Sequence, residues 1–307
     1  MEDGTTYNAA ADLIERNLAA GHGAKTAFID DRGDCSYAAL GERVSRFANG
    51  MRRLGVHREQ RILLCLQDTI DFPTAFLGAI KAGIVPVAVN TQLSPEEFAF
   101  MLADSRARAV VVSAPVLPAM TAALALLPEP RAAVIQSGAE PQAGSLAALL
   151  AGSPATFDTA PTHPDEPCFW LYSSGSTGRP KGTVHVHSSL VQTAELYAVP
   201  VLGIAESDIT FSSTKLFHAY GLGNGLTFPM AVGATSVLMA DRPSPAAVSR
   251  VLREHRATIF YGVPTLYNAM LASKELPGRE ELALRRCVSA GETYMPLTFS
   301  MSSLRPQ

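Results

Sequence analysis

The sequence has few cysteines, no excess of basic charge and no long uninterrupted apolar run. Its 4 cysteines lie far apart and form no CxxC pair, which argues against a zinc site or a disulfide scaffold and fits a reducing compartment. The 25 basic and 28 acidic residues give a net charge of −3, so the charge balance does not indicate nucleic acid as a partner. The length of 307 residues predicts two domains or subdomains, and an apolar fraction of 47% is typical of a soluble globular protein.

Signals for export or membrane insertion are also missing. The first residues, MEDGTTYNAA, are acidic where a signal peptide has a basic segment followed by an apolar one, so we expect a cytoplasmic protein. The uncharged stretch 109–128 is interrupted by Ser113, Pro115, Pro118 and Thr121. We therefore expect strand, turn and helix there and no membrane association.

Helical and strand patterns alternate from residue 36 onward. Ser36 precedes a helical repeat that stops at Gly55, Ser94 begins a capping box with Pro95 at the first helical position, and Ser244 precedes another helix. This alternation predicts an α/β fold with a largely parallel sheet. Further helices are predicted at 71–83, 188–202 and from 264, and strands at 61–66, 85–89, 109–113, 131–136, 258–262 and 286–289.

The chain between residues 137 and 167 is poor in aromatic residues and rich in Ala, Pro and Gly. Such a change in composition is typical of a boundary. We predict one α/β subdomain over 1–160 and a second over 161–292.

The stretch YSSGSTGRPKG, residues 172–182, concentrates glycine, hydroxyl and cationic side chains. Free backbone N–H groups, hydroxyls and a lysine are the groups that hold phosphate oxygens, although an ordinary surface turn has a similar composition. The stretch is not a Walker A loop, because G-x-x-x-x-G-K-[ST] is absent from the sequence. The alternating residues 183–187 predict a strand after the loop, in place of the helix of a P-loop.

Two other patterns leave alternatives open. The glycines of 221–225, followed by an apolar run, a strand at 235–240 and Asp241, resemble a dinucleotide fingerprint, but the third glycine comes one residue early. His185 and His187, two apart on a predicted strand, would share a face and could form a metal pair, although no third ligand is evident. A serine hydrolase is disfavoured because G-x-S-x-G is absent.

The 172–182 stretch closely resembles the signature phosphate loop of the adenylate-forming superfamily, which includes acyl- and aryl-CoA synthetases, adenylation domains and luciferases. The segments LFHAYG at 216–221, GVPT at 262–265 and SAGE at 289–292 are similar to further motifs of this family in order and spacing, as are 81–83 and 86–90 upstream. Residues 183–187 and 215–224 look most like those of benzoate-CoA ligases.

The resemblance implies a role for each matching residue. It places a catalytic His218 near the reacting carboxylate and gives Lys181 the role of adding positive charge at the phosphates. The β- and γ-phosphates of ATP would lie against Ser173, Ser174, Gly175, Ser176, Thr177 and Gly178, the acyl group against Ala219, Tyr220, Tyr261, Val263 and Pro264, and the adenine against Gly291 and Glu292. The competing explanation for Tyr261 is that it packs in the core. For Gly291 and Glu292 it is that they form an ordinary turn after a strand.

The resemblance also implies a reaction and a fold. A small aromatic carboxylic acid would be converted with ATP into an acyl-adenylate and then, with coenzyme A, into a thioester. We expect the two stacked α/β subdomains of the large N-terminal domain of these enzymes, with the C-terminal domain absent.

The residues that bind Mg²⁺ and the ribose in this family have no counterpart in the sequence. Residues 293–307 form a tail that diverges from the family pattern. We therefore expect a fragment with little ligase activity of its own. The alternatives are a noncatalytic nucleotide-binding fragment or pseudoenzyme, a degraded gene product, or a fatty acyl-CoA synthetase fragment.

Overall fold

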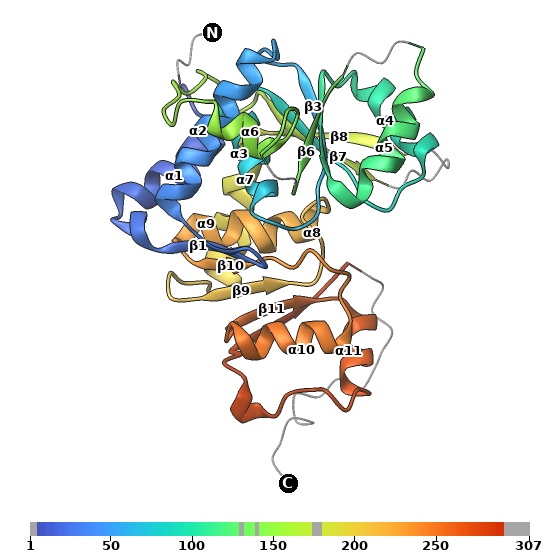
Figure 1. The fold of residues 1–307 in the computed structure, drawn as a ribbon. Helices are drawn as coiled ribbons and strands as arrows, with labels where there is room; N and C mark the ends of the chain where they lie inside the picture. Colours follow the sequence, from blue (N-terminus) through green and yellow to red (C-terminus); the bar gives the residue numbers. More distant parts are fainter. Residues whose placement is uncertain (1–4, 129–131, 139–140, 174–179, 292–307) are drawn as a thin grey trace.

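The computed structural model describes residues 5–128, 132–138, 141–173 and 180–291. Within these ranges the chain forms two six-stranded sheets and the helices that cover them (Figure 1). The α/β class predicted from the alternating pattern is therefore confirmed.

The first sheet has the strand order β6-β5-β3-β4-β7-β8. All its neighbours are parallel except β7 and β8, which run antiparallel. Parallel neighbours need crossover connections, and helices supply them here. The strands are β3 (Arg61–Cys65), β4 (Val85–Ala88), β5 (Ala109–Ser113), β6 (Ala133–Ser137), β7 (Pro167–Ser173) and β8 (Lys181–Val186), and the helices of this half are α2 (Tyr37–Arg53), α3 (Asp71–Lys81), α4 (Pro95–Ser105), α5 (Leu117–Ala125) and α6 (Leu146–Ala151).

The second sheet has the order β12-β11-β9-β10-β1-β2, parallel except for the hairpin of β1 and β2. Its strands are β1 (Thr26–Asp30), β2 (Gly33–Ser36), β9 (Ile209–Ser212), β10 (Thr235–Val237), β11 (Ile259–Gly262) and β12 (Arg286–Ser289). The remaining α-helices are α1 (Ala9–Ala19), α7 (His187–Thr193), α8 (Ala219–Leu222), α9 (Phe228–Val232), α10 (Pro245–Glu254) and α11 (Pro264–Leu271), with π-helical segments η3 (Ala194–Leu202) and η4 (Gly223–Thr227).

Sheet membership does not follow the expected division at residue 160. The N-terminal hairpin β1–β2 pairs with β10, and β7 and β8, which come after residue 160, pair with β4. Each sheet thus contains strands from both sides of that position. The limits 1–160 and 161–292 rest on a change in composition along the sequence, and as domain boundaries they remain a prediction.

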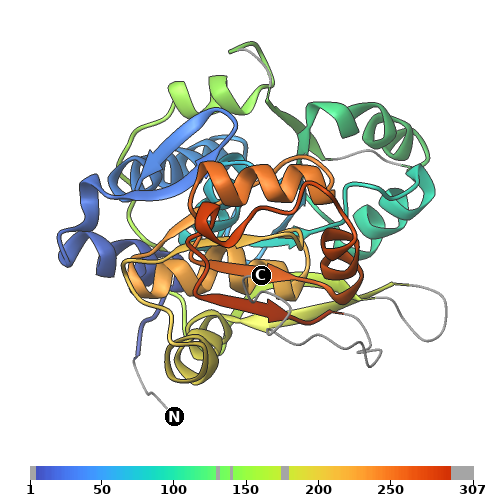
Figure 2. The same cartoon turned by 90° about the horizontal axis from the view of Figure 1, so that it is seen from below.

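Helices and sheets alternate in layers (Figures 1 and 2). One apolar cluster joins α4 and α5 to the outer face of the first sheet, and another joins α10 and α11 to the outer face of the second. The largest cluster lies between the sheets and includes residues of α1, α2 and α3. Strands buried on both faces explain the continuous apolar runs in the sequence.

Local signals placed the helix starts correctly. The side chains of Ser36 and Ser244 accept hydrogen bonds from backbone N–H groups three residues on, and Ser94 and Glu97 form the predicted capping box. The stretch 109–128 forms β5, a 3₁₀ turn and α5, as expected. Within the described part of the chain, no helix combines the length and apolarity needed to cross a bilayer.

Candidate functional site

The phosphate-type loop lies between two antiparallel strands. Ser173, the last residue of β7, pairs with Lys181, the first residue of β8, which confirms the predicted order of strand, loop and strand. Both residues are exposed at the mouth of the loop. The predicted phosphate contacts Ser174, Gly175, Ser176, Thr177 and Gly178, and the adenine contact Glu292, lie outside the described residues.

Tyr172 fixes the strand that leads into this loop. Its hydroxyl donates to Asp104 Oδ2 over 2.7 Å, which ties β7 to the end of α4. Burial, together with the hydrogen bond to Asp104 and the charge of that carboxylate, raises the pKa of Tyr172 far above its ordinary range. The hydroxyl is therefore a permanent donor, and the base of the loop is held from one side.

His218 is at the N-cap position of the short helix α8 and is exposed. The Leu222 N–H donates to the His218 carbonyl over 2.8 Å, and the ring centroids of Phe217 and His218 are 4.6 Å apart. Partial burial lowers the pKa of His218, which favours the neutral imidazole at neutral pH. A neutral ring can donate one hydrogen bond and accept another.

The backbone just before His218 is held by two charged residues that the sequence analysis missed, one buried and one partly buried. Asp68, which follows β3, accepts the Leu216 N–H at Oδ1 over 3.1 Å, and Lys215 Nζ donates to the carbonyls of Met239 and Asp241. Burial raises the pKa of Asp68 to about 6, although the charge of Lys215 opposes this rise. Asp68 sits in a polar stretch after a strand, so it was indistinguishable from a loop residue in the sequence.

The raised pKa of Asp68 predicts a pH dependence of stability. Below pH 3.8, the ordinary pKa of the carboxyl group, Asp68 is protonated in both the folded and the unfolded state. As the pH rises, Asp68 ionises first in the unfolded state, where its pKa is lower, and this shifts the equilibrium toward unfolding. The contribution of Asp68 to the free energy of unfolding should therefore fall between pH 3.8 and about 6. Asp68→Asn keeps the acceptor for Leu216 and should remove this slope.

Urea unfolding of the wild type and Asp68→Asn at intervals from pH 4 to pH 7 measures this effect. At pH 7 we expect the variant to gain stability relative to the wild type, by about 1–3 kcal/mol for a carboxyl shifted by roughly two pH units. Parallel stability curves for the two proteins across this range would contradict the assignment.

A pocket of about 710 Å³ lies where the carboxyl ends of strands from both sheets meet. Gln67, Asn90 and Pro115 follow β3, β4 and β5, while Ser213 and Val263 follow β9 and β11. The exposed His218 also lines this pocket. Ligands of open α/β sheets bind outside the carboxyl ends of the strands, so this is the candidate active site.

Thr214 adds an independent indication of a ligand in this pocket. Its hydroxyl is buried and has no hydrogen-bond partner among the described residues, and the residue lines the pocket. Leaving a buried hydroxyl unpaired costs on the order of 1–3 kcal/mol, which a bound polar molecule could offset.

Three of the predicted site residues come together from separate segments. Gly291 follows β12 with a φ of +87°, and a Cβ atom there would lie 3.5 Å from Val263 Cγ1 and 3.8 Å from Tyr220 Cδ1. The Tyr220 hydroxyl donates to the carbonyls of Gly262 and Val288, each over 3.3 Å. The left-handed φ at 291 favours glycine, while a Cβ atom there would make only ordinary van der Waals contacts with Val263 and Tyr220.

The other predicted acyl-pocket residues have different surroundings. Tyr261 is 0% exposed, and its ring lies edge-on to Tyr220 with 6.5 Å between centroids. Its hydroxyl is buried without a hydrogen-bond partner within the described ranges. Ala219 lines a separate cavity of about 110 Å³ between α7, α8 and the β7–β8 hairpin. Pro264 is the first residue of α11.

The structure gives ordinary explanations for the histidine pair at 185 and 187 and for the glycines of 221–225. His185 stacks on Phe169 with centroids 4.5 Å apart, whereas His187 lies outside the strand as the first residue of α7, and its Nδ1 accepts the Ala9 N–H. The predicted shared strand face is therefore wrong. Residues 219–227 form α8 and η4, and β9 ends at Ser212, so the glycines do not form the turn of a dinucleotide fold.

Comparisons with known proteins agree with this geometry. The family model described as AMP-binding enzyme matches residues 15–300. A benzoate-CoA ligase of Thauera aromatica is 58% identical over 93% of this chain and 54% of its own length. A 4-hydroxybenzoate-CoA/benzoate-CoA ligase of Rhodopseudomonas palustris is 47% identical over 93% of this chain and 53% of its own length.

A solved structure is similar in fold and sequence. The benzoate CoA ligase from Burkholderia xenovorans LB400 aligns with a TM-score of 0.88 and 50% identity, covering 93% of this chain and 56% of that chain. The present chain thus spans about half the length of these relatives.

Proposed function

Because the chain belongs to the AMP-binding enzyme family, we propose that it supplies the phosphate loop and acyl pocket of an aryl-CoA ligase. The supporting observation is the contact of Tyr220, Val263 and Gly291 beside a pocket that His218 lines. The names of the similar proteins favour benzoate or a hydroxybenzoate as the acid. Cytoplasmic location is part of the same proposal.

The proposed reaction has two displacements. A carboxylate oxygen of the acid attacks the α-phosphorus of ATP, so an O–P bond forms and pyrophosphate leaves. The thiol of coenzyme A then attacks the acyl carbon, a C–S bond forms and AMP leaves. Catalysis of such transfers depends mainly on positioning and on stabilisation of charge.

The residues of this chain would share that work. Lys181 and Ser173, with the loop between them, would hold the leaving pyrophosphate, and His218 would orient the carboxylate through its neutral ring. Tyr220 would contact the ring of the acid, and the buried Tyr261 would support Tyr220 edge-on from behind. Gly291, which has no side chain, would let the adenine approach the strand ends.

The described residues do not make a metal site. No group of three or more His, Cys, Asp or Glu side chains in these ranges is arranged to hold a metal ion. No residue among them is therefore assigned to Mg²⁺, which the family pattern links to ATP.

Pyrophosphate exchange with ATP and benzoate tests the proposal. The assay uses this chain joined to the part of the Thauera aromatica relative that lies beyond the alignment, with the unextended chain measured beside it. We expect exchange in the chimera and a loss of about 10²-fold in Lys181→Ala, because that ammonium would stabilise the leaving phosphates. Lys274→Ala, an exposed lysine in a different region, is the matched control.

The acid panel of the same assay separates the competing functions. Benzoate and hydroxybenzoates should outperform hexanoate and octanoate. A preference for the alkyl acids would assign the chain to fatty acyl substrates, and ATP binding without exchange in the chimera would support a noncatalytic nucleotide-binding protein.

A further inference from the structure

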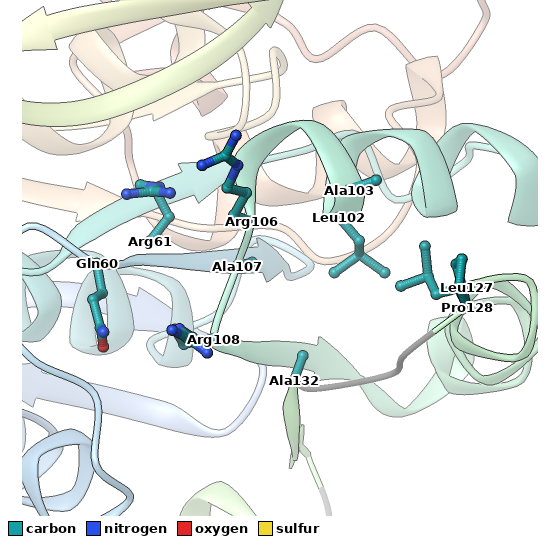
Figure 3. A pocket seen from close by; sticks show the side chains of 10 residues that line it. All are labelled: Gln60, Arg61, Leu102, Ala103, Arg106, Ala107, Arg108, Leu127, Pro128 and Ala132. Atoms are coloured by element: carbon teal, nitrogen blue, oxygen red, sulfur yellow. The ribbon is translucent and has the colours of Figure 1, made fainter.

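Arginines line a second pocket, at the opposite end of the first sheet from the candidate active site. This pocket, of about 590 Å³, is bordered by the amino ends of the parallel strands β3, β5 and β6 and by the C-terminal ends of α4 and α5. Figure 3 shows Arg61, Arg106 and Arg108 on the left of the pocket and Leu127 and Pro128 on the right. The pocket is therefore cationic on one side and apolar on the other.

Arg61 is fixed before any ligand binds. Its Nε donates to the Ser105 carbonyl over 2.7 Å, its Nη1 donates to the Glu59 carbonyl over 3.1 Å, and its guanidinium lies 5.9 Å from the centre of the Trp170 ring. Burial and then the positive charges of Arg106 and Arg108 lower its pKa. Arg106 and Arg108 therefore each lie close enough to Arg61 to repel its charge.

The acidic partners that usually accompany such a cluster are missing among the described residues. None of the described residues that line the pocket is acidic, and the side chains of Arg106 and Arg108 make no hydrogen bond or ion pair with any described residue. Capping of the negative end of α4 would be the structural explanation of these arginines. Only Arg61 donates to a carbonyl at that end, so capping does not account for the other two.

The backbone of Arg106 supports a role for its side chain. It caps α4 with φ 53° and ψ 39°, the left-handed conformation that glycine or asparagine normally supplies at the end of a helix. A non-glycine residue there carries a conformational cost, and such positions are often kept for function.

We propose that this pocket binds an organic phosphate, with the dianionic phosphate on the arginine side and a flat apolar group against Leu102, Leu127 and Pro128. A guanidinium group can donate two parallel hydrogen bonds to the oxygens of one phosphate. The double negative charge of a phosphate also balances several cations better than the single charge of a carboxylate does. Because the pocket is at the amino ends of the strands, this site is separate from the one proposed for ATP and the acid.

Calorimetric titration of the 307-residue chain with phenyl phosphate tests the proposal, with inorganic phosphate and phenol as the two halves of the probe. The test variant is Arg106→Gly/Arg108→Gln, in which glycine also relieves the left-handed backbone, so folding should not suffer. Arg250→Gln, at an exposed arginine of α10, is the control for charge, and Lys181→Ala separates this site from the phosphate loop.

We expect phenyl phosphate to bind the wild type more tightly than either half, with an affinity that falls as salt is added. The double variant should bind at least tenfold more weakly, whereas Arg250→Gln and Lys181→Ala should match the wild type. Equal affinity in the double variant, loss of binding in Lys181→Ala, or no binding to the wild type would each overturn the proposal.

Discussion

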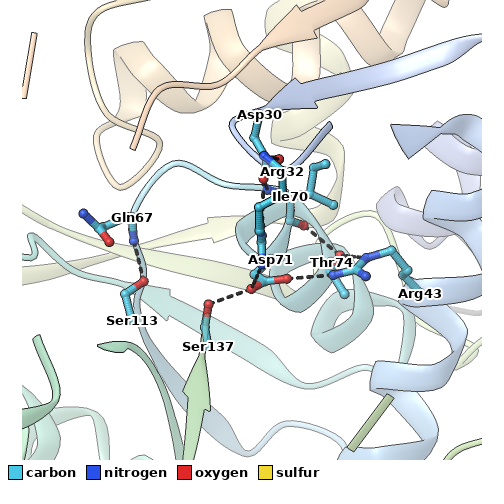
Figure 4. Close-up of polar contacts among 9 residues, drawn as sticks. All are labelled: Asp30, Arg32, Arg43, Gln67, Ile70, Asp71, Thr74, Ser113 and Ser137. Carbon is cyan, nitrogen blue, oxygen red and sulfur yellow. Dashed lines mark hydrogen bonds and ion pairs between the residues drawn. The ribbon is translucent and has the colours of Figure 1, made fainter. Parts of the chain in front are cut away.

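Asp71→Ala is expected to lower the free energy of unfolding by about 2–3 kcal/mol, because it removes the buried acceptor of three hydrogen bonds while both arginine partners stay partly exposed. The Asp71 side chain is 5% exposed and accepts from Arg32 Nη1 at 3.0 Å, from Arg43 Nη2 at 2.7 Å and from Ser137 Oγ at 2.7 Å (Figure 4). Alanine would leave two guanidinium groups and a hydroxyl without their shared acceptor.

The position of this network explains why the loss should be global. Arg32 lies in the turn between β1 and β2 of the second sheet, whereas Ser137 ends β6 at the edge of the first sheet. Asp71, at the start of α3, is thus bonded to both sheets at once. Asp30 extends the connection by accepting from Arg32 and from the Ile70 N–H.

Acid should weaken the same network. Burial alone would raise the pKa of Asp71, but the hydrogen bonds from Arg32 and Ser137 and the charges of Arg32 and Arg43 outweigh it, and the pKa is lower than the ordinary value of 3.8. A carboxyl with a lowered pKa stabilises the fold above 3.8, and this contribution disappears as the pH falls through the folded-state pKa.

Chemical unfolding at pH 7 and pH 3 measures the two effects together. Asp71→Asn keeps the shape of the side chain and should lose less than Asp71→Ala at pH 7, and Ser137→Ala should lose about 1 kcal/mol for one hydrogen bond. A loss below about 1 kcal/mol in Asp71→Ala would mean that solvent replaces the carboxylate, since Arg32 and Arg43 are partly exposed.

Features set by neighbouring residues could be predicted from the sequence, and features set by distant ones could not. The capping box of Ser94 and Glu97 is encoded within four positions, and its helix begins where predicted. The pairing of Phe28 with Ser236 joins residues that nothing local connects, so the hairpin of β1 and β2 and its place in the second sheet were not foreseen.

The same distinction applies to the candidate site. Motif resemblance selected Tyr220, Val263 and Gly291, and the fold brings them into contact. Asp68, Thr214 and Asn224 escaped notice because their buried, polar character appears only after packing. The exposed His218 and the buried Tyr261 look alike as sequence motifs, and only the fold distinguishes an open side chain from a packed one.

Gly221→Ala is expected to destabilise the fold by more than about 3 kcal/mol, at the upper end for overpacking of a core. A Cβ atom at 221 would lie 2.1 Å from the Lys215 carbonyl oxygen and 2.4 Å from that of Thr214. Both are backbone atoms of a fixed segment. The Lys215 ammonium donates to the Asp241 carbonyl, and the Leu216 N–H donates to Asp68. The added methyl group must therefore displace the segment that carries His218.

Thermal unfolding of Gly221→Ala, with Gly23→Ala as the control, tests this account of the glycine. An alanine Cβ at 23 would meet its nearest neighbours at 3.8 Å, so that variant should stay within about 0.5 kcal/mol of the wild type. In the chimera, Gly221→Ala should also weaken the use of benzoate, because His218 moves. A wild-type melting temperature for Gly221→Ala would show that the segment carrying His218 can move at little cost. The close approach of Gly221 to the Lys215 and Thr214 carbonyls would then not be what positions His218.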